Sequence, residues 1–186
     1  MADLAKLRSL IAHVARSRPA LGKVRLFKLL YLIDFSAHAE LGHSVTGEMY
    51  ESFEMGPVPR TLWKRFDEIT RECVIVESVQ TALGIPEQQI LSRDDFAVTL
   101  TTKETAIADH ILAQYGGYSG NSLRDLTHKQ LPYLATPRGE IIPYGLAGYL
   151  FYKRPSSTDV NSIRSNKRLM DSVRDAVKAK RARAVA

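Results

Sequence analysis

The sequence holds few of the residues and motifs on which catalysis or covalent cross-linking depends. Only one of its 186 residues is a cysteine, Cys73, so no disulfide can form within the chain and a reducing compartment is expected. It contains no glycine-rich phosphate loop, no Cys-x-x-Cys pair and no Gly-x-Ser-x-Gly elbow. His38 and His43 are five residues apart, which does not place them on one helix face, so they do not predict a metal site. We therefore expect no catalytic residues, no metal, no cofactor and no enzyme activity.

Long apolar stretches are also absent. No run approaches the roughly 20 apolar residues that are needed to span a bilayer. The N-terminus lacks the basic region followed by a continuous apolar block that is typical of a signal peptide. We expect a cytoplasmic protein that makes no contact with membranes.

The positive charge is concentrated at one end of the chain. The formal net charge is +6, yet residues 153–186 contain 10 Lys or Arg and only 3 Asp or Glu. The remaining 152 residues are therefore close to neutral, with 16 basic and 17 acidic side chains. This distribution weakens the hypothesis that the whole protein is a nucleic-acid binder, and it restricts possible DNA binding to the basic tail.

Hydrophobic periodicity predicts a mainly α-helical α+β fold: a compact helical domain around a buried central helix, with a small β-hairpin or sheet. The central helix is expected over residues 23–41, which are apolar on nearly every face and end at Gly42. We expect four further helices in the domain, at about 2–17, 59–72, 102–115 and 121–129. Thr102 is the expected N-cap of the third of these, and strands are expected at about 49–53, 73–79 and 89–91.

We expect two parts in the chain, a domain over residues 1–152 and a basic helical tail over 153–186. The tail has a seam of apolar residues at helical spacing, consisting of Val160, Ile163, Met170, Val173 and Val177. Its other faces carry basic residues that include Arg164, Lys167 and Arg174. An amphipathic basic helix of this kind lies on its own core, on a partner, on a membrane or on nucleic acid.

Several motifs occur in a fixed order in the domain. Residues 28–35 read Lys-Leu-Leu-Tyr-Leu-Ile-Asp-Phe, and they are followed by Thr46-Gly47, Tyr50 and a Gly-Pro-Val-Pro corner. This order resembles the Panacea domain of SocA-like antitoxins. The similarity continues through Leu-Thr-Thr-Lys-Glu at 100–104 and the stretch 114–129. It covers about residues 5–150 and does not extend to the tail, and Tyr133 replaces a tryptophan that is usual in the family.

The resemblance implies an antitoxin that binds and neutralises a cognate toxin encoded in the same operon, often in prophage or other mobile DNA. The domain pairs with toxins of unrelated chemistry, so the resemblance names neither the toxin nor the stoichiometry. Some members act as adaptors that present a partner to a protease. No catalytic residue is implied.

Neutralisation is expected to be steric, with the domain and the tail covering the toxin. The candidate toxin contacts are Tyr31, Asp34, Tyr50, Gly56, Pro57, Val58, Pro59, Val160, Ile163, Arg164, Lys167, Met170, Val173, Arg174 and Val177. For Asp34 the alternative is a structural role such as capping a nearby loop. For the Gly-Pro-Val-Pro corner it is a rigid strand-to-helix connection, and Phe53 and Trp63 are expected in the core more often than at an interface.

The second hypothesis is DNA binding, as a transcriptional regulator or autorepressor of the operon. Two early helices, a hairpin at about 73–91 and a basic tail resemble a winged-helix arrangement. However, the helix at 23–41 is too apolar to be a recognition helix.

Overall fold

A computed structural model describes residues 2–80, 86–152 and 155–166 of the chain, and one buried helix is its central element. This helix, α2 (Lys23–Leu41), is buried at every residue from Leu26 to Ala37. It ends at Gly42, whose φ of 78° is the left-handed conformation that glycine adopts without strain. The prediction of a buried central helix with these ends is confirmed.

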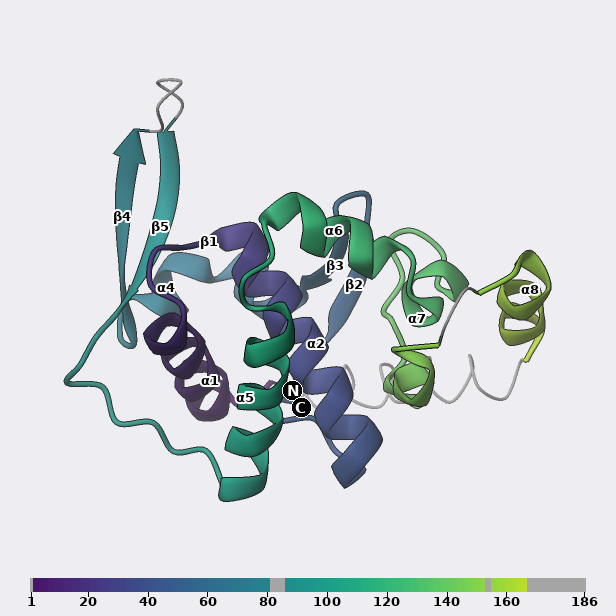
Figure 1. Cartoon of the computed structure of the whole chain (residues 1–186), viewed down its shortest axis with the longest axis horizontal. Helices are drawn as coiled ribbons and strands as arrows, with labels where there is room; N and C mark the ends of the chain where they lie inside the picture. The colour runs from purple at the N-terminus through teal and green to yellow at the C-terminus, as the bar shows by residue number, and fades with distance from the viewer. Residues whose placement is uncertain (1, 81–85, 153–154, 167–186) are drawn as a thin grey trace, which may run out of the picture.

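The other elements pack around α2 and give the expected mainly α-helical α+β fold. The helices are α1 (Leu4–Ser17), α3 (Arg60–Lys64), α4 (Phe66–Thr70), α5 (Thr102–Tyr115), α6 (Gly120–His128), α7 (Leu131–Ala135), α8 (Ser157–Ser165) and the 3-10 helix η1 (Tyr144–Tyr149). Helices α1 and α5 lie alongside α2, and α6 crosses near its N-terminal end (Figure 1). No helix in the described ranges is long and apolar enough to cross a bilayer.

Two small antiparallel sheets complete the fold. The first has the strand order β1-β5-β4, formed by β1 (Leu21–Gly22), β4 (Val74–Gln80) and β5 (Pro86–Ser92). Its β4–β5 hairpin, in which Val76 pairs with Ile90, projects away from the helices (Figure 1). The second is a hairpin of β2 (Tyr50–Phe53) and β3 (Gly56–Pro59), with Tyr50 opposite Pro59. The three predicted strands are confirmed.

Two predicted helix boundaries differ from the structure. Thr101, not Thr102, is the N-cap of α5, because its extended backbone lets the side chain accept from Glu104 N while the Glu104 carboxylate accepts from Thr101 N. The helix expected over 59–72 is split into α3 and α4, because Arg65 leaves the helical region with φ −126° and ψ 35°. The expected buried side of this segment, Leu62, Phe66 and Ile69, is confirmed.

The Gly-Pro-Val-Pro segment is a strand as well as a corner. All four residues of β3 are buried and pair with β2, and Pro59 then serves as the N-cap residue of α3. Prolines are tolerated here because β3 pairs on one side only, so no second strand needs their missing N–H groups.

A buried carboxylate fastens α2 to the segment that follows it. Asp34 has no exposed surface, and it accepts hydrogen bonds from Thr46 N, from Thr46 Oγ1 and from the Tyr50 hydroxyl. Burial raises the pKa of Asp34, and these hydrogen bonds lower it. The net pKa is about 6, so the side chain is a carboxylate at neutral pH. This is the loop-capping role that was the structural alternative for Asp34.

A second buried carboxylate, Glu48, fixes the start of α3. Its Oε1 accepts from Thr61 N at 3.0 Å and its Oε2 from Leu62 N at 3.0 Å. Pro59 supplies no side-chain cap to α3, so Glu48 satisfies N–H groups that the helix itself leaves without partners. Together Asp34 and Glu48 hold the chain between α2 and α3 in one path.

A smaller apolar cluster joins α7, η1 and α8. It consists of Leu131, Ala135, Leu146 and Ile163, with Val160 packed against it. Arg164 donates hydrogen bonds to Leu134 O and Ala135 O. In the part of the tail that the structure describes, the apolar residues of α8 therefore lie on α7.

We expect the substitution Asp34→Ala to lower the free energy of unfolding by about 3 kcal/mol, because it leaves the buried Thr46 N–H and Tyr50 hydroxyl without an acceptor. Urea unfolding followed by circular dichroism measures the loss. The control is Asp95→Ala, which removes an exposed carboxylate and is expected to change the value by no more than about 0.5 kcal/mol. Equal small losses in the two variants would contradict the anchoring role.

Candidate functional site

The predicted contacts on and after α2 lie in the interior. Tyr31, Asp34 and Tyr50 have no exposed surface. The rings of Tyr31 and Tyr50 are 5.4 Å apart in a T-shaped arrangement, and Phe35 packs against both. In this structure these three side chains stabilise the core and present no surface to a partner.

The Gly-Pro-Val-Pro segment is likewise enclosed. Gly56 has a φ of 91°, and a Cβ there would lie 2.8 Å from Lys28 Nζ and 3.1 Å from Thr127 Oγ1, so a larger residue does not fit. Lys28 Nζ donates to Pro57 O at 2.8 Å. The segment is thus a rigid connection held between α2 and α6, which is one of the two roles considered for it.

Beside this segment, at Val58, the surface forms an apolar groove, here called the Trp63 groove. Its volume is about 380 Å³, and its apolar lining consists of Val24, Phe27, Phe53, Met55, Val58 and Trp63. Four of these side chains are substantially exposed: Val24 at 41%, Phe53 at 37%, Met55 at 49% and Trp63 at 54%. Because these exposed apolar side chains gather around one groove, the groove is a candidate interaction surface.

Aromatic contacts hold Trp63 in place. The Trp63 ring meets the Phe27 ring edge to face at 6.1 Å, and Phe27 meets Phe66 in the same way at 6.2 Å. Lys23 Nζ lies 3.9 Å from the Phe66 ring centroid and 5.2 Å from that of Trp63. Burial lowers the pKa of Lys23, and the charge of Asp67 opposes this effect. The indole is therefore preorganised on α3, whose first turn Glu48 caps.

Three basic side chains and one carboxylate lie at the groove. Lys23, Lys28 and Arg138 contribute to its lining, together with the single carboxylate Glu54. Arg138 Nη2 contacts Glu54 Oε2 at 2.7 Å at an exposed position. Lys28 is buried beneath the groove, and burial followed by the charge of Arg124 lowers its pKa to about 7.

The chemistry of this surface suits binding. No group of three or more His, Cys, Asp or Glu side chains able to hold a metal occurs in the parts of the chain that the structure describes. Cys73 is buried, and burial raises the pKa of its thiol to about 12, which keeps it protonated. Tryptophan, phenylalanine, methionine and arginine, by contrast, are the residues enriched in the cores of protein interfaces.

Sequence reasoning did not find this groove. The expectation that Phe53 and Trp63 are core residues is wrong, since both are exposed. The exposure of Trp63 could have been inferred from the spacing. Leu62, Phe66 and Ile69 form the buried side of the segment, and Trp63 does not belong to that side. Nothing in the sequence pattern predicted that Met55, in the turn between the two strands, would be exposed beside Trp63.

The predicted tail contacts fall into two groups. Val160 and Ile163 pack on α7, and Arg164 donates to backbone carbonyl groups there. Lys167, Met170, Val173, Arg174 and Val177 lie outside the residues that the structure describes. Of the predicted tail contacts within the described residues, Val160, Ile163 and Arg164 do not line the Trp63 groove.

The buried Lys28 predicts a pH dependence of stability. Between pH 7 and 10.5 the Lys28 amine is protonated in the unfolded chain but largely neutral in the folded chain. The contribution of Lys28 to the free energy of unfolding therefore increases as the pH rises through that window. The penalty for protonating Lys28 is fully present below pH 7. Wild type should therefore gain stability relative to Lys28→Met as the pH rises.

Urea titrations of both proteins across this window measure the difference. Lys129→Met, which removes an exposed lysine, is the matched control. A difference between wild type and Lys28→Met that does not change with pH would contradict the burial effect.

Comparison with known proteins supplies one match. A family model described as antitoxin SocA-like, Panacea domain, matches residues 26–132, which is more than half of the chain. The matched segment runs from α2 through the β2–β3 hairpin and α3 to the start of α7. Neither a curated protein nor a solved structure matches the chain at a significant level.

Proposed function

The chain belongs to the SocA-like antitoxins with a Panacea domain, and we propose on that premise that it binds a cognate toxin protein and neutralises it. The observation that carries the proposal is the Trp63 groove, an exposed apolar surface within and beside the matched segment. The toxin would be encoded in the same operon and meet the antitoxin in the cytoplasm. Neutralisation would be steric, because the groove offers a docking surface and no catalytic group.

The groove has the features of an interface centre. Trp63 is the kind of residue that most often dominates binding energy, and its ring already packs against Phe27 and Lys23 in the free protein. A preorganised side chain loses little conformational entropy on binding, so more of the contact energy remains as affinity. A stable interface buries about 800 Å² on each partner, so the toxin would also cover surface around the groove.

The charges around the groove define the partner surface that would fit. Lys23 and Arg138 flank apolar side chains, and one carboxylate, Glu54, lies among them. We therefore propose that the toxin inserts an apolar side chain into the groove and places carboxylates near these cations. Such complementarity would favour the correct partner and speed association at low salt.

DNA binding has less support as a function of this domain. A recognition helix must expose side chains to the major groove, whereas α2 is buried from Leu26 to Ala37. The proteolytic adaptor role remains compatible with toxin binding, since an adaptor must also hold its partner.

We expect Trp63→Ala to weaken toxin binding by about 30-fold, because truncation of a central tryptophan typically costs about 2 kcal/mol or more. The protein encoded by the neighbouring gene would be co-expressed and purified, and its affinity measured by calorimetry. The control is Ile75→Ala on β4, where the native side chain is 47% exposed but lies outside the groove. If both variants bind as tightly as wild type, the Trp63 groove is not the toxin site.

The basic tail requires a separate test that retains α8. A chain ending at Asn166 keeps the cluster of Ile163 with α7 but removes the basic residues that follow it. If those residues contact the toxin, the shortened protein should bind more weakly and with a shallower salt dependence. Affinity and salt dependence equal to those of the full chain would remove the tail from the interface.

A further inference from the structure

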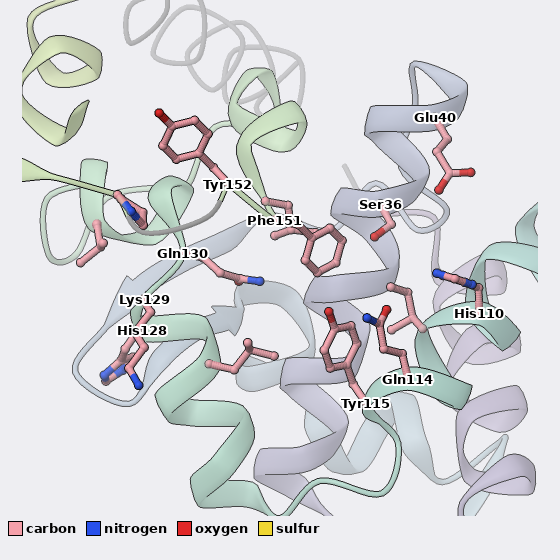
Figure 2. Close-up of a pocket in the computed structure, with 15 residues that line it drawn as sticks. Ser36, Glu40, His110, Gln114, Tyr115, His128, Lys129, Gln130, Phe151 and Tyr152 are labelled. Atoms are coloured by element: carbon pink, nitrogen blue, oxygen red, sulfur yellow. The ribbon is translucent and has the colours of Figure 1, made fainter.

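A second concave surface, here called the aromatic cleft, lies toward the C-terminal half of α2. It has a volume of about 760 Å³, and its lining includes Ser36, Tyr115, Gln130, Leu150, Phe151 and Tyr152. These residues come from α2, the end of α5, the turn before α7 and the segment after η1 (Figure 2). Ser36 is nine residues beyond Phe27 of the Trp63 groove, or about 13 Å along the helix axis, so the two sites are separate.

Unpartnered buried polar groups distinguish this cleft from an ordinary surface hollow. Gln130 is only 4% exposed, and neither Nε2 nor Oε1 of its side chain has a hydrogen-bond partner among the described residues. Ser36 is 5% exposed, and its Oγ is likewise without a partner in that part of the chain. Because buried polar atoms in folded proteins are nearly always paired, two such groups in one cleft make it a candidate ligand site.

The position of Gln130 also supports a ligand site in the cleft. It is the N-cap residue of α7, yet its side chain makes no capping hydrogen bond. The amide extends instead toward the space flanked by Phe151 and Tyr115 (Figure 2). The side chain of Gln130 is thus directed into the cleft.

From these contacts we propose that the aromatic cleft binds an extended peptide segment of a partner protein. The Gln130 amide presents a donor and an acceptor side by side. The N–H and C=O groups of one residue in an extended strand also point to the same side, so a single residue of the peptide can pair with both atoms of the amide. Ser36 Oγ offers one further hydrogen bond.

The walls fit the side chains of such a peptide. The Tyr115 and Phe151 rings are parallel within 8°, with centroids 5.9 Å apart, and Phe151 is 48% exposed. These rings suit an apolar or aromatic side chain. The lining of the cleft includes a carboxylate, Glu40, as well as a lysine, Lys129, which favours a neutral backbone over a polyanionic ligand.

The cleft must open slightly for the pairing to form. The two amide atoms of Gln130 are sealed from solvent, whereas Phe151, with its large exposed fraction, lies at the rim. Phe151 follows η1 and belongs to neither α2 nor α7, so rotation of its side chain is the opening motion that the proposal requires.

The test uses the full chain and a phage-displayed library of random linear dodecapeptides as the probe. Peptides enriched on the wild-type protein are synthesised, and their affinities are measured by fluorescence anisotropy. Gln130→Leu and Phe151→Ser are each expected to weaken binding by on the order of tenfold or more. Gln88→Leu, the same chemical change at an exposed position on β5, is the matched control and should leave affinity unchanged.

Thermal unfolding separates a binding role from a structural one. Gln130→Leu replaces unpartnered polar atoms by an apolar side chain, so its Tm should equal or exceed that of wild type. A lower Tm would mean that Gln130 holds the fold, and would overturn the proposal. The proposal would also be overturned if the peptides bound Gln130→Leu as tightly as wild type, or if no peptide depended on the cleft. Displacement of the peptides by adenosine, whose base also presents a donor beside an acceptor, would overturn it as well. Trp63→Ala should not affect these peptides, so the outcome is independent of toxin binding at the Trp63 groove.

Discussion

The structure depends on two buried carboxylates that accept hydrogen bonds from the chain following α2. Asp34 anchors the Thr46 turn and the Tyr50 hydroxyl, and Glu48 caps the start of α3. A buried carboxylate is costly unless donors surround it, so the path of the chain that supplies those donors is strongly specified. The β2–β3 hairpin and α3 therefore have one arrangement relative to α2.

This constraint determines where the Trp63 groove lies. Trp63 is in α3, and Phe53 and Met55 are in or beside the hairpin, so all three are positioned by the segment that the carboxylates fix. Lys28, which donates to Pro57 O, fastens the same hairpin from beneath. The exposed apolar side chains of the Trp63 groove are thus carried on a rigid support, which suits a protein that acts by holding another.

Much of the fold could be predicted from the sequence, and less of the site. Helices α2 and α5 have the predicted extents, because their local sequence and their tertiary burial agree: α2 is apolar on nearly every face, and each helix is followed directly by a glycine. The pairing of Gly56–Pro59 with β2 is local, with Phe53 opposite Gly56, but glycine and proline are depleted in strands, so composition argued against it. The break at Arg65 has no glycine or proline to mark it in the sequence. The motifs at residues 28–35 and 56–59 are buried and report on the scaffold. Trp63 and Met55, which are exposed, belong to neither motif.

The anchoring hydrogen bonds run largely to main-chain atoms: Thr46 N, Thr61 N, Leu62 N and Pro57 O. Every residue type except proline supplies such an N–H group, and every residue supplies a carbonyl. The outward side chains at positions 53, 55 and 63 can therefore change while the scaffold keeps its shape. In evolutionary terms, a domain built in this way can exchange one partner for another through surface substitutions alone, without having to find a new fold.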